Sequence, residues 1–248
     1  VFTVPQELNP LIYSNQQILY DALYHCVSET INELTTDSKH LGAKVGYICV
    51  LHTWGSEMNY HPHIHVILLG GGLTAKNQWR DKGEEFFLPV KVMSKLFRGK
   101  YMDELKSLYE AKKLQFHGSS EKYRNRYAFK ELLNICYDKD WVPHCKKTFN
   151  GAQSVINYLG KYTHRIAISN HRIIRMDEDT VTYYVKDYRE EGKWKEFTIS
   201  GIEFIRRFLM HVPPKRFVRI RHYGLLCTRT KTRHLTLCRT LLGCKQYL

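Results

Sequence analysis

The stretch from His61 to Gly72, HPHIHVILLGGG, constrains the fold more than any other part of this sequence. Successive side chains of an extended strand point to opposite faces, so His63 and His65 share one face. Pro62 has no amide hydrogen and is tolerated only at the start of such a strand. The apolar residues that follow are typical of a strand buried on both sides within a sheet. We therefore predict a central strand that carries two imidazoles, and a flexible turn at glycines 70–72.

A second strand is predicted directly before it, over residues 43–54 (AKVGYICVLHTW). A short polar turn over residues 55–60 joins the two strands, which favours an antiparallel pair. This pairing places His52 opposite His63 or His65, within side-chain reach.

These residues predict a metal site that needs a third ligand, for which His52 is the first choice and Glu57 the second. A carboxylate plus imidazoles with open positions suits Mg²⁺ or Mn²⁺, and a closed tetrahedral site suits Zn²⁺. A structural role for the histidines, as hydrogen-bonded groups of the core, is the alternative.

The remaining pattern indicates an α+β protein in which helices cover a central antiparallel sheet. Residues 74–147, rich in charge and aromatics, are interpreted as a mostly helical insertion. Residues 171–248 are interpreted as a β-hairpin, turning near residues 190–192, followed by a basic extension. Helices are predicted over residues 6–34, 92–114, 127–136 and 201–210, and β-structure over residues 166–175, 181–187 and 194–200.

Positive charge is concentrated at the end of the chain. The net charge is +14, and from Ile205 onward the sequence contains eleven Lys and Arg residues and no Asp or Glu. Such a segment predicts binding to a polyanion, most simply nucleic acid, and a solvated basic surface is the alternative. The predicted phosphate contacts are Arg165, Arg206, Arg207, Lys215, Arg216, Arg219 and Arg221, and His222 and Tyr223 are predicted to meet unpaired bases.

Several classes of protein are disfavoured by composition. No apolar run approaches the roughly 20 residues that span a bilayer, and no secretory signal is visible at the start. Seven cysteines without a C-x-x-C pair indicate reduced thiols and a cytoplasmic protein. The chain does not begin with Met, which indicates a fragment of a longer protein.

A helix predicted over residues 151–165 (GAQSVINYLGKYTHR) carries a second group of reactive side chains. Tyr158 and Tyr162 are four residues apart and therefore share a helical face, and Lys161 lies between them. A tyrosine hydroxyl can act as a covalent nucleophile. Two tyrosines at this spacing are also common as simple packing residues, so the pair alone does not decide between the two roles.

The combination of the two motifs is more specific than either motif. A strand with His-hydrophobic-His, followed later by Y-x-x-K-Y on a helix, resembles the HUH single-strand endonucleases. Within them the chain resembles the two-tyrosine rolling-circle transposases of the insertion-sequence group numbered ninety-one. The resembling segments are LHTWG (51–55), HPHIHVILLGGGL (61–73), NYLGKYTHRIAISNHR (157–172) and FIRRFLMHVPPKRFVRIRHYG (204–224).

The resemblance implies a role for each motif residue. His63 and His65 are the implied ligands of Mg²⁺ or Mn²⁺, and the third ligand stays open. Tyr158 and Tyr162 are the implied nucleophiles that form a 5′-phosphotyrosine, with Lys161 beside the scissile phosphate. Members of the group usually carry a cysteine-rich zinc module ahead of the nuclease, and this sequence contains none.

The sequence thus predicts a single HUH nuclease domain over residues 1–248 that cleaves and rejoins single-stranded DNA in rolling-circle transposition. Its expected location is the bacterial cytoplasm, at the nucleoid when bound to DNA, without membrane association. A plasmid replication initiator or relaxase would share this chemistry. A catalytically inert nucleic-acid-binding domain and a zinc-site protein are the alternatives from other classes.

Overall fold

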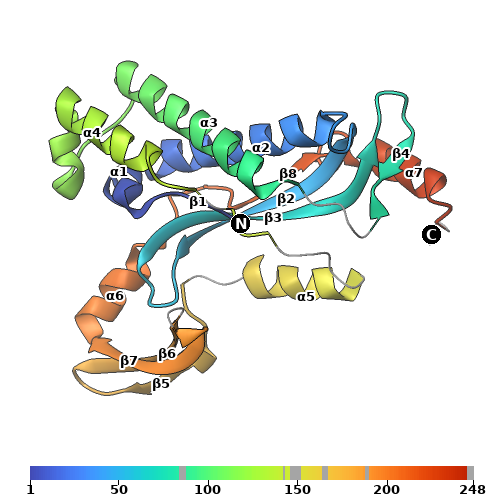
Figure 1. Cartoon of the computed structure of the whole chain (residues 1–248). Coiled ribbons are helices and arrows are strands. Elements are labelled where there is room, and N and C mark those ends of the chain that lie inside the picture. The colour runs from blue at the N-terminus through green and yellow to red at the C-terminus, as the bar shows by residue number, and fades with distance from the viewer. Residues whose placement is uncertain (84–87, 142, 146–151, 164–166, 188–189, 245–248) are drawn as a thin grey trace.

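The computed structural model describes residues 1–83, 88–141, 143–145, 152–163, 167–187 and 190–244. In the helix α5 (Ala152–Thr163) it describes only the backbone of residues 152, 158, 159 and 161–163. The predicted α+β class is confirmed, because antiparallel sheets are combined with helices that cover them (Figure 1).

A five-stranded antiparallel sheet forms the centre of the molecule, with the strand order β1-β3-β2-β8 and with β4 paired to β3. The predicted pair of neighbouring strands is confirmed as β2 and β3, joined by the turn at residues 55–59. The strand bounds are β1 Phe2–Thr3, β2 Lys44–Trp54, β3 Tyr60–Leu73, β4 Trp79–Asp81 and β8 Ile220–Gly224.

One face of this sheet is covered by the N-terminal and inserted helices (Figure 1). Apolar residues recur on α2 at helical spacing and pack against alternate residues of β2, such as Tyr47, Cys49 and Leu51, which are almost fully buried. The bounds are η1 Gln6–Leu8, α1 Asn9–Ser14, α2 Gln16–Thr36, α3 Val90–Glu110, η3 Gly118–Arg124 and α4 Arg126–Tyr137.

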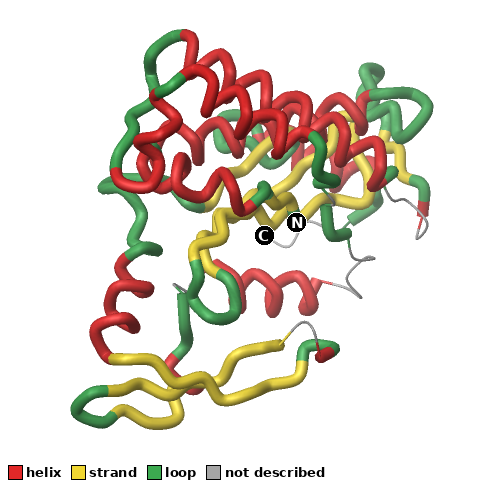
Figure 2. Tube along the Cα trace, turned by 60° about the vertical axis from the view of Figure 1, so that its left-hand side comes forward, coloured by secondary structure: helices red, strands yellow, loops and turns green. Residues whose placement is uncertain are grey.

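The opposite face of the sheet looks toward α5 and a separate three-stranded sheet, as both views show (Figure 2). This small sheet has the order β5-β6-β7, and α6 follows its last strand. Its own core joins Val181, Tyr183 and Val185 to Met58 from the β2–β3 turn. The bounds are η4 Asn170–Arg172, β5 Ile173–Met176, β6 Thr180–Asp187, β7 Lys193–Ser200, α6 Gly201–Leu209 and α7 Lys231–Leu241.

Three predictions about these elements need correction. The β-structure predicted over residues 166–175 is only partly strand, because residues 170–172 form η4 and β5 begins at Ile173. Residues 6–34 are helical but interrupted at Asn15, whose side chain donates to the carbonyl oxygens of Leu11 (2.9 Å) and Gln115 (2.7 Å). The turn predicted at residues 70–72 is wrong, because β3 continues to Leu73. A Cβ atom on Gly72 would lie 2.3 Å from the Lys44 carbonyl oxygen, so glycine here permits close approach of two strands.

The seven cysteines all lie within the described residues and form no disulfide there. None of the described helices combines the length and the apolar character needed to cross a membrane.

Candidate metal centre

The two central strands bring three histidines to one face of the sheet. His52 of β2 lies directly opposite His63 of β3, and Val50 lies opposite His65. Residues that face each other across antiparallel strands project to the same side, so His52, His63 and His65 form one cluster. The alternate residues, among them Leu51 and Ile64, point into the core beneath α2. The histidine cluster therefore faces α5 and the small sheet (Figure 1).

The cluster has the dimensions of a metal site. One ring nitrogen from each histidine can be chosen so that all three lie within 4.8 Å of one another. The Nε2 atoms of His63 and His65 are 3.2 Å apart. His63 Nδ1 lies 2.6 Å from the carbonyl oxygen of His61 and donates a hydrogen bond to it, which leaves the Nε2 lone pair available. Such a backbone bond commonly orients a metal-binding imidazole.

Burial keeps the imidazoles of His63 and His65 neutral. It lowers the pKa of His63 to about 3, and the neighbouring His52 adds to the effect. Burial and His52 likewise lower the pKa of His65 to about 2. His52 is itself only 3% exposed and stacks on the Trp54 ring at a centroid distance of 4.5 Å. A metal ligand must be unprotonated, so the neutral imidazoles of His63 and His65 suit a divalent cation.

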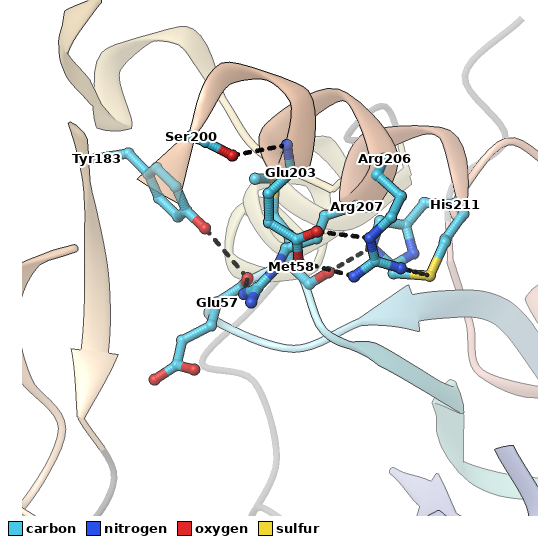
Figure 3. A network of polar contacts seen from close by, with 9 residues as sticks. Glu57, Met58, Tyr183, Ser200, Glu203, Arg206, Arg207 and His211 are labelled. Atoms are coloured by element: carbon cyan, nitrogen blue, oxygen red, sulfur yellow. Dashed lines mark hydrogen bonds and ion pairs between the residues drawn. The ribbon is translucent and has the colours of Figure 1, made fainter. Parts of the chain in front are cut away.

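Glu57, the alternative third ligand, has a different position. Its carbonyl oxygen accepts hydrogen bonds from the Tyr183 hydroxyl (3.2 Å) and from Arg207 Nη1 (2.8 Å), and its carboxylate points away from this network (Figure 3). Among the described residues, the group of three possible donors contains His52 and not Glu57. The geometry thus favours His52 for the third position.

The same network ties the turn between the histidine strands to the small sheet and α6. Glu203 accepts from Arg207 Nε at 2.7 Å and from Arg206 Nε at 2.6 Å, and these bonds hold its pKa at about 2. His211 Nε2 lies 3.0 Å from the Met58 carbonyl oxygen (Figure 3). We call the bonds that Arg207 and His211 make to the turn the turn clamp. It fixes the end of the hairpin that carries the histidines.

The two tyrosines and Lys161 all lie on α5, so the predicted helix is confirmed. Their side chains are outside the described part of the chain. The backbone of α5 lies on the side of the central sheet that carries the histidine cluster (Figures 1 and 2). Arg165 is also outside the described residues.

The other predicted DNA contacts divide into three groups. Lys215, Arg216 and His222 are exposed. Arg206 and Arg207 pair with Glu203. The basic segment also supplies β8, which includes Arg221 and Tyr223 and follows Arg219 directly.

Arg221 and Tyr223 point away from the histidines. Arg221 forms an ion pair with Asp21 on α2 and lies over the Tyr24 ring at 4.0 Å. Tyr223 stacks on Tyr47 at 5.3 Å. These two side chains stabilise the packing of β8 against the helical layer.

A groove runs along the histidine face, with a volume of about 1070 Å³. This slightly exceeds the roughly 300–1,000 Å³ of small-molecule pockets and suits an extended ligand. Besides the cluster, it is lined by residues that the sequence analysis did not single out: Trp54, His171, Arg172, Tyr184, Lys186 and Trp194. Alternation along β6 and β7 would have placed Tyr184, Lys186 and Trp194 on one face of the small sheet. Only the tertiary fold shows that this face borders the histidines.

Comparison with known proteins gives the family. A family model described as "Putative transposase" (Y2_Tnp) matches residues 46–234, which include the histidine strands, α5 and the small sheet. The chain belongs to this transposase family. The predicted resemblance to transposases of insertion-sequence group ninety-one is thereby confirmed.

Two transposase relatives illustrate the match. The chain is 41% identical over 244 residues to "Putative transposase y4qJ" of Sinorhizobium fredii, covering 98% of this chain and 61% of that protein. It is 27% identical over 236 residues to "Transposase for insertion sequence element IS801" of Pseudomonas savastanoi pv. phaseolicola, covering 95% of this chain and 55% of that protein. This transposase chain thus spans about three fifths of the length of these relatives. No solved structure matches it.

Proposed function

We propose that the chain is the nuclease part of a rolling-circle transposase, and that it cleaves and rejoins single-stranded DNA through a covalent tyrosine intermediate. The single observation that carries the proposal is the cluster of the buried His52 with the half-buried His63 and His65, on the face that looks toward α5. Membership of the transposase family supports DNA as the substrate. We further propose that residues 1–248 act as one domain, in the bacterial cytoplasm where the chromosome lies.

The residues present fit a divalent ion. Ring nitrogens of three imidazoles converge, and His63 holds its lone pair toward His65 because its other nitrogen is bonded to a backbone oxygen. Mg²⁺ and Mn²⁺ also take oxygen ligands, which the DNA phosphate and water can supply. When bound, such an ion polarises the scissile phosphate and offsets the charge that develops there.

In this proposal the chain's own residues supply the nucleophile and its orientation. The hydroxyl oxygen of Tyr158 or Tyr162 forms a bond to phosphorus, and the bond from phosphorus to the 3′ oxygen breaks. The tyrosine proton leaves and the 3′ oxygen gains a proton, so the products are a 5′-phosphotyrosine and a 3′-hydroxyl. Lys161 stabilises the tyrosinate by its charge. Because the covalent bond retains the energy of the phosphodiester, rejoining needs no ATP.

Two tyrosines on one helical face allow two strand ends to be held in succession. One tyrosine keeps the first 5′ end while the other cleaves the next strand. The use of two tyrosines in succession distinguishes a transposase that transfers a DNA strand from an enzyme that only nicks one.

A denaturing gel tests the proposal. Labelled single-stranded DNA that carries an element end is incubated with the protein and Mn²⁺ or Mg²⁺, or with chelator. We expect a metal-dependent protein–DNA band, its loss in the Tyr158→Phe/Tyr162→Phe double variant, and its loss in His63→Ala. Tyr127→Phe, on the far helix α4 and 85% exposed, is the matched control and should keep the band. A band that persists in the double variant would show that neither tyrosine is the nucleophile, and tight binding without any adduct would favour an inert binding domain.

A further inference from the structure

One wall of the groove is formed by the exposed face of the small sheet. Lys186 of β6 lies directly opposite Trp194 of β7, so the two side chains share a face. Tyr184, two residues before Lys186, lies on that face too. All three line the same groove as the histidine cluster. The opposite face of β6 is used for packing, since Tyr183 and Val185 are fully buried.

Trp194 is unusually exposed for so large an aromatic side chain. It is 55% exposed, although its ring lies in a concave surface. Lys186 Nζ lies 5.1 Å from the ring centroid and Arg172 Cζ lies 5.7 Å from it. An aromatic surface flanked by cations is the combination that binds single-stranded nucleic acid, because bases stack on the ring and phosphates meet the charges.

This wall is held in place relative to the histidine strands. The backbone nitrogen of Lys186 donates to Ser56 Oγ at 2.5 Å, and Ser56 lies in the turn between β2 and β3. Arg172 donates to the carbonyl oxygens of Ser56 (2.5 Å) and Tyr184 (2.8 Å). Two of these bonds join the Trp194 wall to the hairpin that carries the histidines, and the third holds Arg172 against β6. A DNA strand that contacts both the Trp194 wall and the histidine cluster therefore follows a fixed path between them.

We propose that Trp194 is a stacking platform for one unpaired base of the substrate strand, and that Lys186 contacts a neighbouring phosphate. The proposal rests on the proposed function for the nature of the ligand. A paired base in a duplex has no free face, so the platform favours single-stranded over double-stranded DNA. Among the described residues that line the groove none is acidic, which agrees with a polyanionic ligand.

The test is a scan of base stacking in the presence of chelator, where cleavage does not interfere. A set of single-stranded oligonucleotides, each with one abasic position, is titrated against wild type, Trp194→Ala, Trp194→Leu and Trp194→Phe. Tyr137→Ala is the matched control, because Tyr137 is 52% exposed and has Arg98 over its ring at 4.6 Å, but lies on α4 outside the groove.

Wild type should lose affinity at one abasic position by about 5- to 150-fold, the range for one stacked base. Trp194→Ala and Trp194→Leu should bind the intact strand more weakly by a similar factor and be insensitive to that abasic position. Trp194→Phe should keep part of the effect, and Tyr137→Ala should match wild type.

If wild type, Trp194→Ala and Trp194→Leu all show the same abasic profile, the stacking platform is overturned. Formation of the protein–DNA adduct would in that case still support the proposed nuclease. Failure of wild type to bind any single strand would overturn both proposals. Since Trp194 is largely exposed, its replacement should leave the circular dichroism spectrum unchanged, and Trp194→Leu provides a second variant if Trp194→Ala unfolds.

Discussion

At the scale of single residues, the candidate centre depends on three imidazoles, of which His63 and His65 are kept neutral by burial and by the neighbouring His52. The sequence alone could predict His63 and His65 as a pair, because alternation in a strand is strict. It left the third ligand open between His52 and Glu57, since cross-strand register depends on where the turn closes. The structure resolves that register with His52 directly opposite His63.

The first prediction separates these two candidates. His52→Ala should weaken Mn²⁺ binding by at least about 10- to 100-fold, because even outer-shell partners of a metal ligand contribute that much. Glu57→Gln should leave it nearly unchanged, since the converging group of donors contains His52 and not Glu57. Isothermal titration of both variants measures the difference, and the reverse order of effects would assign the ligand to Glu57.

The second prediction concerns stability against pH without metal. An unfolded histidine gains a proton near pH 6.5, whereas His63 and His65 do so only at about 3 and 2. Below pH 6.5 the unfolded state therefore binds more protons, and stability falls with decreasing pH by up to about 1.4 kcal/mol per pH unit for each histidine.

Urea titrations at pH 7 and pH 5 with chelator measure this slope. His65→Gln should remove about half of it, and His222→Gln, which removes an exposed imidazole, should not change it. An equal slope in all three proteins would mean that other groups control acid stability.

At the scale of elements, the sequence predicted the helices and strands that are determined by the pattern of neighbouring residues. The strand pair β2–β3, the helices α3, α4 and α5 and the hairpin β6–β7 follow from apolar periodicity and turn residues. It could not predict that β8 pairs with β2, because this contact joins strands more than 160 residues apart. It misread residues 70–72 for a related reason, since a glycine run does not reveal whether it serves a turn or a close approach of strands.

The third prediction tests the turn clamp. Arg207 is 20% exposed in its side chain and bonds both Glu203 and the Glu57 carbonyl, so Arg207→Ala should lower the free energy of unfolding by about 1–3 kcal/mol. Arg206, 58% exposed, bonds Glu203 without contacting the turn. Arg206→Ala should cost at most about 1 kcal/mol, as surface ion pairs do. Urea unfolding compares the two, and equal losses would show that the clamp contributes no more than a surface pair.

At the scale of the whole molecule, the two faces of the central sheet have different roles. The helical layer buries one face and holds β8 through Arg221 and Tyr223, and the other face presents the histidines, α5 and the groove. The basic C-terminal segment, predicted as a uniform DNA-binding extension, therefore contributes residues to both faces.

The fourth prediction uses salt to count phosphate contacts. Affinity for single-stranded DNA should fall by about 0.7 log units per log unit of salt for each contact. The double variant Lys215→Gln/Arg216→Gln should reduce this slope by about 1.4, as both residues are exposed in the basic segment. Lys112→Gln/Lys113→Gln, an equal change of charge after α3, is the control, and equal slopes for the two double variants would argue against the basic segment as the binding surface.

The pairing of β8 with β2 also determines when, during synthesis of the chain, the central sheet can be completed. A ribosome that has completed β2 at Trp54 must add more than 160 further residues before β8 exists, which takes roughly 10 to 30 s at bacterial elongation rates. Throughout that interval β2, which carries His52, has an unpaired edge, and for most of it Arg207 and His211 of the turn clamp are missing as well. A chain that is still being synthesised therefore has its histidines but not the finished central sheet, so the histidine cluster reaches its final surroundings only after residues 220–224 have been made.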